Sequence, residues 1–473
     1  MSEQVFKYFR EICSIPHGSC NMEKIADYCV NFADSLGLKS VRDTANNVII
    51  YKKGSKGYEN SSPVILQGHL DMVCQKTADS EIDFLNDKIE VYTDGDYLKA
   101  KNTTLGGDNG IAVSMIMAIL ADNNLSHPPI EAVFTTDEEI GMIGASQLEF
   151  SLLSAKKMIN LDSEEEDVVT VSCAGGSDFT ACIPIVRESK RGINVTVTLD
   201  GLKGGHSGVE INKGRVNADI LMGRFLNHLA GTCDFEIISI NGGNKGNAIP
   251  NRCVADLVVQ NPDSFKAEAQ EYLNVIKNEI SARENNFSFL LKINSDGEYP
   301  VIASDAKQSI ISAIYTVPNG IIEMSAEIDG LVETSLNLGI LQTETDRILL
   351  NFALRSNKQS ALNALEDRLT AFFAFIDSQI SVSGHYPPWE YKENSDLREL
   401  YIKNYKSVFG KEVRVEAIHA GLECGIFSAN IPDLDCIAIG PDLSDVHTVN
   451  EKLSISSTIR IFNLILKILQ ESK

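Results

Sequence analysis

The sequence has no excess of positive charge and no long apolar run. Its 473 residues include 42 lysines and arginines against 65 aspartates and glutamates, which gives a formal net charge of −23. Nucleic acids and anionic membranes are bound through a basic face, so this balance argues against both as partners. Apolar runs such as residues 113–120 are far shorter than the roughly 20 residues that cross a bilayer.

The cysteines also lack a pattern. All ten are scattered, without a Cys-x-x-Cys pair or a dense disulfide framework. In a chain of this size, such cysteines indicate the reduced thiols of a cytoplasmic protein. Residues 1–4 are polar and do not begin the basic-then-apolar pattern of a signal peptide, which leads to the same expectation of a cytoplasmic location.

The length favours two or three domains, because one hydrophobic core rarely organises so long a chain. Strands and helices alternate over residues 1–186 and again over 386–473, which is typical of an α/β domain. Residues 187–385 instead show alternating strands of an antiparallel α+β domain. We therefore predict a discontinuous α/β domain, with a mixed sheet flanked by helices, that is interrupted by an inserted α+β domain. A weak echo between residues 237–280 and 332–376 predicts two related halves within the insertion.

Potential metal ligands follow four of the predicted strands, and one more lies at a Gly-rich helix start. In chain order they are His69, Asp108, Glu138, Glu139, Asp162 and His447. Sheets of this class place their sites beyond the carboxyl ends of the strands. Two histidines and several carboxylates suit zinc, cobalt or manganese, and their number allows two ions that share a bridging carboxylate.

Each candidate also has an ordinary structural explanation. Asp108 could be a helix N-cap, and residues 137–139 could form a solvated acidic turn. His206 lies among glycines and could belong to a surface loop, while Arg355 could be one half of an ion pair. Several ligands at one edge of one sheet would nevertheless be a large coincidence, so together they favour a site.

Seven short motifs occur in order along the chain. They are Gly-His-Leu-Asp-Met-Val (68–73), Leu-Gly-Gly-Asp-Asn-Gly (105–110), Thr-Asp-Glu-Glu-Ile-Gly (136–141), Leu-Asp-Ser (161–163), Gly-His-Ser-Gly (205–208), Gly-Asn-Ala-Ile-Pro (246–250) and Val-His-Thr (446–448). With these motifs, and over essentially its whole length, the sequence resembles a two-domain, di-metal peptidase family. That family contains aminoacylases, the glutamate carboxypeptidase and bacterial dipeptidases.

The resemblance implies a ligand set for two divalent ions, expected to be Zn²⁺, for which Co²⁺ or Mn²⁺ could substitute. Asp108 would bridge the two ions. His69 and Asp162 would complete the first ion's ligands. Glu139 and His447 would complete those of the second ion.

The same resemblance implies the catalytic residues. Asp71 would orient the imidazole of His69. Glu138 would take a proton from a water that bridges the metal ions and pass it to the leaving amine. His206, on an inserted domain that acts as a lid, would donate a hydrogen bond to the oxyanion of the tetrahedral intermediate.

Substrate binding is the third implication. Asn247, Arg355 and Gly421 would hold the peptide, with Arg355 gripping its free carboxylate in a forked pair. The expected activity is hydrolysis of unblocked dipeptides with histidine in the second position, β-alanyl-histidine included, by a monomer or a homodimer. Aminoacylase, deacetylase or tripeptidase activity are the alternatives within the family. A metal-free binding protein is disfavoured, because no ligand or base is missing.

Overall fold

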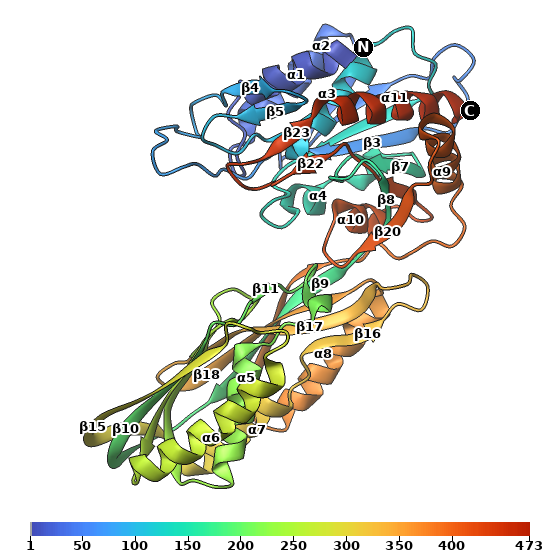
Figure 1. Ribbon diagram of the computed structural model, residues 1–473. Helices are drawn as coiled ribbons and strands as arrows, with labels where there is room; N and C mark the ends of the chain where they lie inside the picture. Colours follow the sequence, from blue (N-terminus) through green and yellow to red (C-terminus); the bar gives the residue numbers. More distant parts are fainter. Residues whose placement is uncertain (1) are drawn as a thin grey trace. The chain divides into compact units, whose positions relative to one another are not determined.

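The computed structural model describes residues 2–473, which divide into two compact units (Figure 1). The first unit comprises the chain up to Cys173 together with Tyr391–Ala417 and Leu422–Lys473. The second unit comprises Ala174–Glu390 and Ile418–Gly421. The first unit is thus discontinuous in sequence.

An eight-stranded mixed sheet forms the centre of the first unit. In spatial order its strands are β1 (Lys39–Arg42), β2 (Val48–Lys52), β6 (Ile130–Thr135), β3 (Val64–His69), β7 (Lys157–Asn160), β21 (Asp435–Ala438), β8 (Val168–Cys173) and β20 (Arg414–Ile418). The middle four strands, β6, β3, β7 and β21, run parallel to one another. The pairs β1–β2, β2–β6 and β21–β8 are antiparallel. The predicted mixed α/β sheet is confirmed.

Helices lie on both sides of this sheet (Figure 1). They are α1 (Ser2–Cys13), α2 (Glu23–Ser35), α3 (Gly107–Ala121), α4 (Ile143–Gln147), α9 (Asp396–Phe409), α10 (Glu423–Asn430) and α11 (Ile455–Glu471). Helix α3 is buried from Ile111 to Leu120, because it is apolar on every side and packs between α1 and β3. Of the helices in residues 2–473, none combines the length and apolarity that a membrane span requires.

A four-stranded sheet completes the first unit. Its strands, in spatial order, are β22 (Leu443–Ser444), β23 (Lys452–Ser454), β5 (Tyr97–Ala100) and β4 (Val91–Asp94). Strands β4 and β5 form a hairpin that turns at residues 95 and 96. This sheet ties the C-terminal segment to the chain just before α3.

The second unit is built on a nine-stranded antiparallel sheet. Its spatial order is β15 (Ser288–Ile302), β10 (Arg187–Asp200), β14 (Cys253–Val259), β12 (Phe235–Gly242), β17 (Val332–Thr343), β18 (Arg347–Ser356), β9 (Gly175–Pro184) and β19 (Gln379–Tyr386), with β16 (Gly320–Met324) beside β17. Helices α5 (Ala218–Ala230), α6 (Pro262–Ile280), α7 (Ser304–Thr316) and α8 (Gln359–Ala374) share one hydrophobic core with these strands. Figure 1 shows these helices on one face of the sheet. The α+β character expected of the insertion is confirmed.

The sheet of the second unit repeats one arrangement. Strands β12 and β14 form a hairpin followed by α6, and β17 and β18 form a hairpin followed by α8. These hairpins correspond to the echo between residues 237–280 and 332–376. They meet at a single backbone pair, Gly242 with Leu341, and at Thr343, whose amide donates to Asn241 Oδ1 over 2.9 Å.

The division between the units differs from the boundaries inferred from sequence texture. We placed the insertion at residues 187–385, whereas the second unit begins at Ala174 and runs to Glu390. The reason is β9, which follows the α/β unit in sequence but is hydrogen-bonded between β18 and β19 of the antiparallel sheet. Residues 418–421 also join the second unit, where the carbonyls of Ile418 and Ala420 accept from the amide of Ala174.

Candidate metal centre

The four parallel strands of the first unit bring the ligand-bearing loops to one edge of the sheet. His69, the last residue of β3, is paired in register with Thr135, the last residue of β6. Asn160, which ends β7, is paired with Ala438 at the end of β21. Because these strands run parallel, their carboxyl ends meet at the same edge. His69 ends β3, the segments after β6, β7 and β21 carry Glu139, Asp162 and His447, and Asp108 lies at the start of α3.

Asp108 stands between two groups of potential ligands. His69, Asp108 and Asp162 place one ligand atom each within 4.8 Å of one another, and so do Asp108, Glu139 and His447. Oδ1 of Asp108 lies 3.2 Å from His69 Nε2, while its Oδ2 lies 3.1 Å from His447 Nε2. His447 Nε2 is also 2.9 Å from Glu139 Oε1, and His69 Nε2 is 3.6 Å from Asp162 Oδ1. The two oxygens of one carboxylate therefore face two separate groups.

The charges around these groups fit divalent cations. Burial would lower the pKa of His69, but Asp162 and Asp108 raise it well above its ordinary value. Hydrogen bonds to Asp108 and Glu139 raise the pKa of His447 to about 11. Across residues 2–473, no lysine or arginine pairs with any of these carboxylates. Closely packed carboxylates and imidazoles without a basic side chain are the donor set that divalent transition metals prefer.

Glu138 lies beside these ligands in the loop after β6. With His69 and Glu139 it forms a third group of potential ligand atoms within 4.8 Å. Burial, together with the charges of Asp162, Glu423 and Glu139, raises the pKa of Glu138 well above its ordinary value. The loop conformation lets Glu138 and Glu139 reach the same site, whereas neighbouring residues of a strand would face opposite ways.

In the second unit, the predicted oxyanion donor His206 has a defined tautomer. Its Nδ1 accepts hydrogen bonds from the amides of Gly208 (3.1 Å) and Val209 (3.2 Å). A nitrogen that accepts two N–H groups carries no proton, so the neutral ring carries its proton on Nε2. Burial, and then the nearby charge of Arg355, lowers the pKa of His206 and favours this neutral form. His206 can therefore act as a hydrogen-bond donor through Nε2.

Arg355 is a buried cation that forms no ion pair within residues 2–473, although the Asp178 carboxylate lies near enough to interact with its charge. The Arg355 side chain, on β18, is 9% exposed, and one amino group donates to the Tyr386 hydroxyl over 2.8 Å. Its Nε is buried and has no hydrogen-bond acceptor among the described residues. A Cβ atom on Gly208 would lie 3.1 Å from this Nε and 2.9 Å from the His206 ring. Arg355 and His206 are thus brought together around a glycine that leaves no space for a side chain.

The other two predicted substrate-binding residues lie close by in the second unit. The carbonyl of Asn247 accepts from the amide of Ser207 over 2.9 Å, and the Asn247 side chain is exposed. Gly421 follows His419, whose carbonyl a Cβ atom on Gly208 would approach to 2.5 Å. The structure thus groups the predicted residues of the second unit with one another.

A family model described as peptidase family M20/M25/M40 matches residues 65–471. The chain belongs to this family. It is therefore a metallopeptidase, a hydrolase that uses divalent metal ions. The match spans both units and all of the predicted site residues.

Similar proteins cover almost the whole chain. Cytosol non-specific dipeptidase from Escherichia coli (strain K12) is 38% identical over 99% of this chain and 97% of its own length. The crystal structure of aminoacylhistidine dipeptidase from Vibrio alginolyticus superposes with a TM-score of 0.91 at 36% identity, covering 99% of this chain and 96% of that one. Aminopeptidase PepT from Bacillus cereus, at 13% identity and a TM-score of 0.58 over 100% and 99% of the two chains, shares the fold.

In this metallopeptidase, the carboxylate of Asp71 accepts several hydrogen bonds in addition to its contact with the imidazole of His69. The imidazole Nδ1 of His69 lies 3.0 Å from the Asp71 carbonyl and 3.4 Å from its carboxylate. That carboxylate accepts hydrogen bonds from the amides of Glu138 (2.9 Å) and Glu139 (3.2 Å) and from the Ser19 hydroxyl (2.8 Å). Asp71 therefore also fixes the loop that carries the predicted base.

Replacing Asp71 with asparagine should lower turnover more than metal content. The new amide would present two N–H groups to partners that are themselves donors, so the loop of Glu138 should shift. We expect kcat to fall roughly 10–100-fold, the usual cost of losing a residue that supports a metal ligand. Steady-state kinetics and metal analysis of the same preparation measure both quantities. Equal losses of metal and activity would contradict this expectation.

Two residues beside the metal ligands of the first unit, and one beside Arg355 in the second unit, were not predicted from the sequence. Asn109 Oδ1 accepts from the His69 amide (3.2 Å), and its Nδ2 donates to Asp162 Oδ1 (3.0 Å). Glu423 is fully buried and accepts from the Thr135 hydroxyl (2.7 Å), and burial raises its pKa to about 7. Only the position of Asn109, beside Asp108 in the Gly-rich motif, offered a sequence signal.

The third unpredicted residue is His419 of the second unit. Its Nε2 lies 2.7 Å from the Ser335 hydroxyl and its Nδ1 lies 3.2 Å from Asn357 Oδ1. Burial, reinforced by the charge of Arg355, lowers the pKa of His419 to about 3. The His419 ring is therefore neutral. Of these two neighbouring residues, only Arg355 carries a positive charge that can bind an anion.

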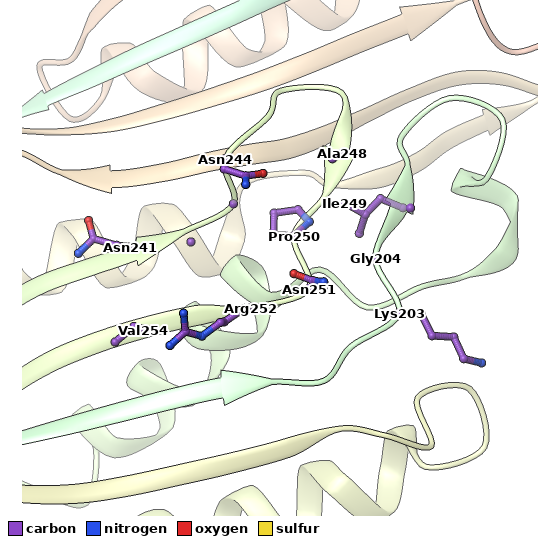
Figure 2. A pocket seen from close by; sticks show the side chains of 13 residues that line it. Lys203, Gly204, Asn241, Asn244, Ala248, Ile249, Pro250, Asn251, Arg252 and Val254 are labelled. Carbon is purple, nitrogen blue, oxygen red and sulfur yellow. The ribbon is translucent and has the colours of Figure 1, made fainter. Parts of the chain in front are cut away.

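A pocket of about 540 Å³ in the second unit is lined in part by Gly205 of β11 (Gly205–His206) and by β13 (Ala248–Ile249), which pairs with β11 (Figure 2). Its lining includes Lys203 and Arg252 but no carboxylate or imidazole. In Figure 2 the side chains of Lys203 and Arg252 point away from each other. This pocket therefore offers no set of metal ligands and is not the candidate centre.

Proposed function

We propose that this metallopeptidase is a dipeptidase that hydrolyses peptides with both termini free, using two divalent ions. The observation that carries the proposal is the position of Asp108, whose two oxygens face His69 and His447 separately. The E. coli relative, named a non-specific dipeptidase, and the Vibrio structure, an aminoacylhistidine dipeptidase, support the substrate class. Dipeptides with histidine in the second position, β-alanyl-histidine included, are the substrates that we propose first.

The ligands of the two ions follow from the two groups that share Asp108. His69 and Asp162 would hold one ion, and Glu139 and His447 would hold the other, most simply as Zn²⁺. Held by these residues, two divalent ions would acidify an attacking water and polarise the peptide carbonyl. Co²⁺ or Mn²⁺ would suit the same oxygen and nitrogen donors.

Glu138 is the proposed general base. Its carboxylate is free to take a proton from the attacking water and return it to the leaving amine, because it need not serve as a ligand. Two divalent ions nearby would keep this carboxylate ionised, and the same ions would acidify the water whose proton it accepts. The amides of Glu138 and Glu139, bound by Asp71, keep its backbone in place during the transfer.

Residues of the second unit are proposed to bind the reacting peptide. The Nε2–H of His206 would donate to the oxyanion, a role that its Nδ1 acceptor bonds prepare. The unpaired guanidinium of Arg355 would bind the free carboxylate of the substrate. Asn247 and the backbone at Gly421 would complete the substrate contacts. His206 and Arg355 are neighbours within one chain. We therefore propose that both residues of an active site come from the same chain, in a monomer or in a homodimer.

We also propose a cytoplasmic location. No disulfide joins the ten cysteines within residues 2–473, and the E. coli relative is named a cytosol dipeptidase; both observations support this location. Reduced cysteines are usual in the cytoplasm. Fractionation of cells that express the protein would test this location directly.

Chelation followed by metal restoration tests the proposed function. We expect activity on a dipeptide panel to vanish after chelation and to return with Zn²⁺, Co²⁺ or Mn²⁺. The unfolding temperature should fall in the metal-free protein, because bound ions stabilise the folded state by mass action. The panel pairs each free dipeptide with its N-acetylated form. Fastest turnover of an N-acetylated substrate would replace the dipeptidase proposal with an aminoacylase.

A further inference from the structure

The loop before α3 is held by one buried carboxylate from the C-terminal segment. Glu451 is 4% exposed and accepts hydrogen bonds from four consecutive backbone amides. These are the amides of Leu105 (2.7 Å) and Gly106 (3.1 Å) on Oε2, and of Gly107 (2.8 Å) and Asp108 (3.3 Å) on Oε1. Both oxygens of the carboxylate are thus occupied by the segment that ends at Asp108.

These amides need an acceptor from outside the helix. The backbone of Asp108 (φ −85°, ψ 106°) and of Asn109 (φ −118°, ψ 26°) departs from helical geometry, so regular hydrogen bonding starts after them. The N–H groups at a helix start have no carbonyl in the preceding turn, and a buried N–H without a partner destabilises the fold. A carboxylate is the strongest acceptor that a side chain offers such a row of amides.

The same short segment also contacts the side chain of Asp108. Glu451 lies four residues after His447, and its amide donates to the Thr448 carbonyl over 3.2 Å. His447 Nε2 lies 3.1 Å from Asp108 Oδ2. Residues 447–451 therefore hold Asp108 at two points, its backbone through Glu451 and its carboxylate through His447.

The close approach of Glu451 depends on a glycine. A Cβ atom on Gly107 would lie 3.1 Å from Glu451 Oε1 and 3.0 Å from Leu443 Cδ2. Contacts this short would force the carboxylate or the loop to shift. The variant Gly107→Ala should consequently disturb the contact between Glu451 and the loop, although the Glu451 side chain is still present.

We propose that Glu451 is a positioning residue, which orients Asp108 so that its two oxygens can serve two metal ions. This inference rests on the proposed function, because it takes Asp108 as the bridging ligand. Glu451 does not touch the ions, and it acts through the backbone of residues 105–108. Replacing a residue that holds a metal ligand in position, without touching the metal itself, typically changes the metal affinity.

Glu131 is a matched control for a purely structural effect. It is also buried in the first unit, at 5% exposure, and it accepts from the amides of Ser154 (3.0 Å) and Ala155 (3.1 Å) and from the Ser154 hydroxyl (2.6 Å). It lies near the start of β6, at the opposite end of that strand from the ligand loop. Its loss should weaken the fold without reaching the metal centre.

The experiment compares Co²⁺ binding by the metal-free full-length protein and its variants. Affinity is measured by competition with a chelator, coordination by the visible absorption of Co²⁺, and stability by thermal unfolding. For Glu451→Gln we expect a roughly 10–100-fold loss of Co²⁺ affinity and an altered absorption spectrum. Glu131→Gln should lower the unfolding temperature and leave both Co²⁺ readouts unchanged. Gly107→Ala should shift affinity and spectrum in the direction of Glu451→Gln, and it carries the test if that variant does not fold.

The outcomes separate the inference from the proposed function. Wild-type affinity and spectrum in Glu451→Gln, or in Gly107→Ala where only that variant folds, would show that Glu451 only stabilises the loop and would overturn the inference. Failure of the wild-type protein to bind Co²⁺, or undiminished binding by Asp108→Asn, would overturn the proposed two-metal function and the inference with it. Loss of affinity in Glu451→Gln alongside unchanged binding in Glu131→Gln supports the positioning role.

Discussion

Glu138→Gln should retain its metal ions and lose almost all turnover. Glutamine keeps the size and polarity of the side chain but cannot accept the proton of an attacking water at neutral pH. Positioned general bases contribute roughly 10²–10⁴-fold to rates, so we expect kcat to fall by about 10³-fold. The Asp71 carboxylate binds the amide of residue 138, not its side chain, so the loop should keep its conformation. Steady-state kinetics on a dipeptide and metal analysis of the same sample measure the two effects.

The neighbouring variant Glu139→Gln provides the contrast. Glu139 Oε1 lies 2.9 Å from His447 Nε2 and belongs to the group around Asp108, so its replacement should reduce metal content. Added metal should partly restore activity in Glu139→Gln and should not restore it in Glu138→Gln. If Glu138→Gln keeps activity within tenfold of the wild-type protein, another residue must be the base.

The core of the first unit could be predicted because its signals are local. The strands before His69, Glu139 and Asp162 are short apolar runs that end at polar residues, and the structure ends β3, β6 and β7 at these points. A parallel sheet then brings those ends together without further information. Ligand types and strand order were therefore enough to predict one edge as the candidate site.

Contacts between distant segments could not be predicted in this way. Glu451 binds amides more than 340 positions earlier in the chain, and nothing in the sequence around it marks it as different from an ordinary acidic residue. The position of β9 is a similar case, because its sequence continues the α/β pattern while its hydrogen bonds belong to the antiparallel sheet.

Charged side chains that lack an ion-pair partner are negative in the first unit and positive in the second unit. In the first unit, carboxylates such as Asp108 and Asp162 are half-buried, and within residues 2–473 histidines are their only positive partners. In the second unit, Arg355 is buried with a hydroxyl partner and a neutral His419 nearby. Burying unpaired charge costs stability, so such arrangements are expected where a ligand supplies the missing charge. A dipeptide with a free carboxylate supplies an anion, and divalent ions supply the cations.

Arg355→Ala should weaken catalysis strongly without a matching loss of stability. Removing one partner of a buried charge pair costs about 2–5 kcal/mol, so we expect kcat/KM for a free dipeptide to fall roughly 10²–10³-fold, mainly through KM. The unliganded protein loses an unpaired buried cation, so its unfolding temperature should change little or rise. Kinetics with a dipeptide and with its C-terminal amide separates the two effects, because the amide lacks the carboxylate. The wild-type protein should prefer the free acid, and Arg355→Ala should lose that preference.

Arg347 on the same strand is the control for this prediction. It lies at the other end of β18, its side chain is 47% exposed, and it pairs with Glu344 over 2.6 Å. Exposed ion pairs contribute little, so Arg347→Ala should keep both the rate and the preference for the free acid. A preference for the free acid that survives in Arg355→Ala would mean that another cation binds the substrate carboxylate. Comparing Arg355→Ala and Arg347→Ala on the free dipeptide and on its amide isolates the interaction between Arg355 and the substrate carboxylate. The test is therefore independent of any general effect on folding.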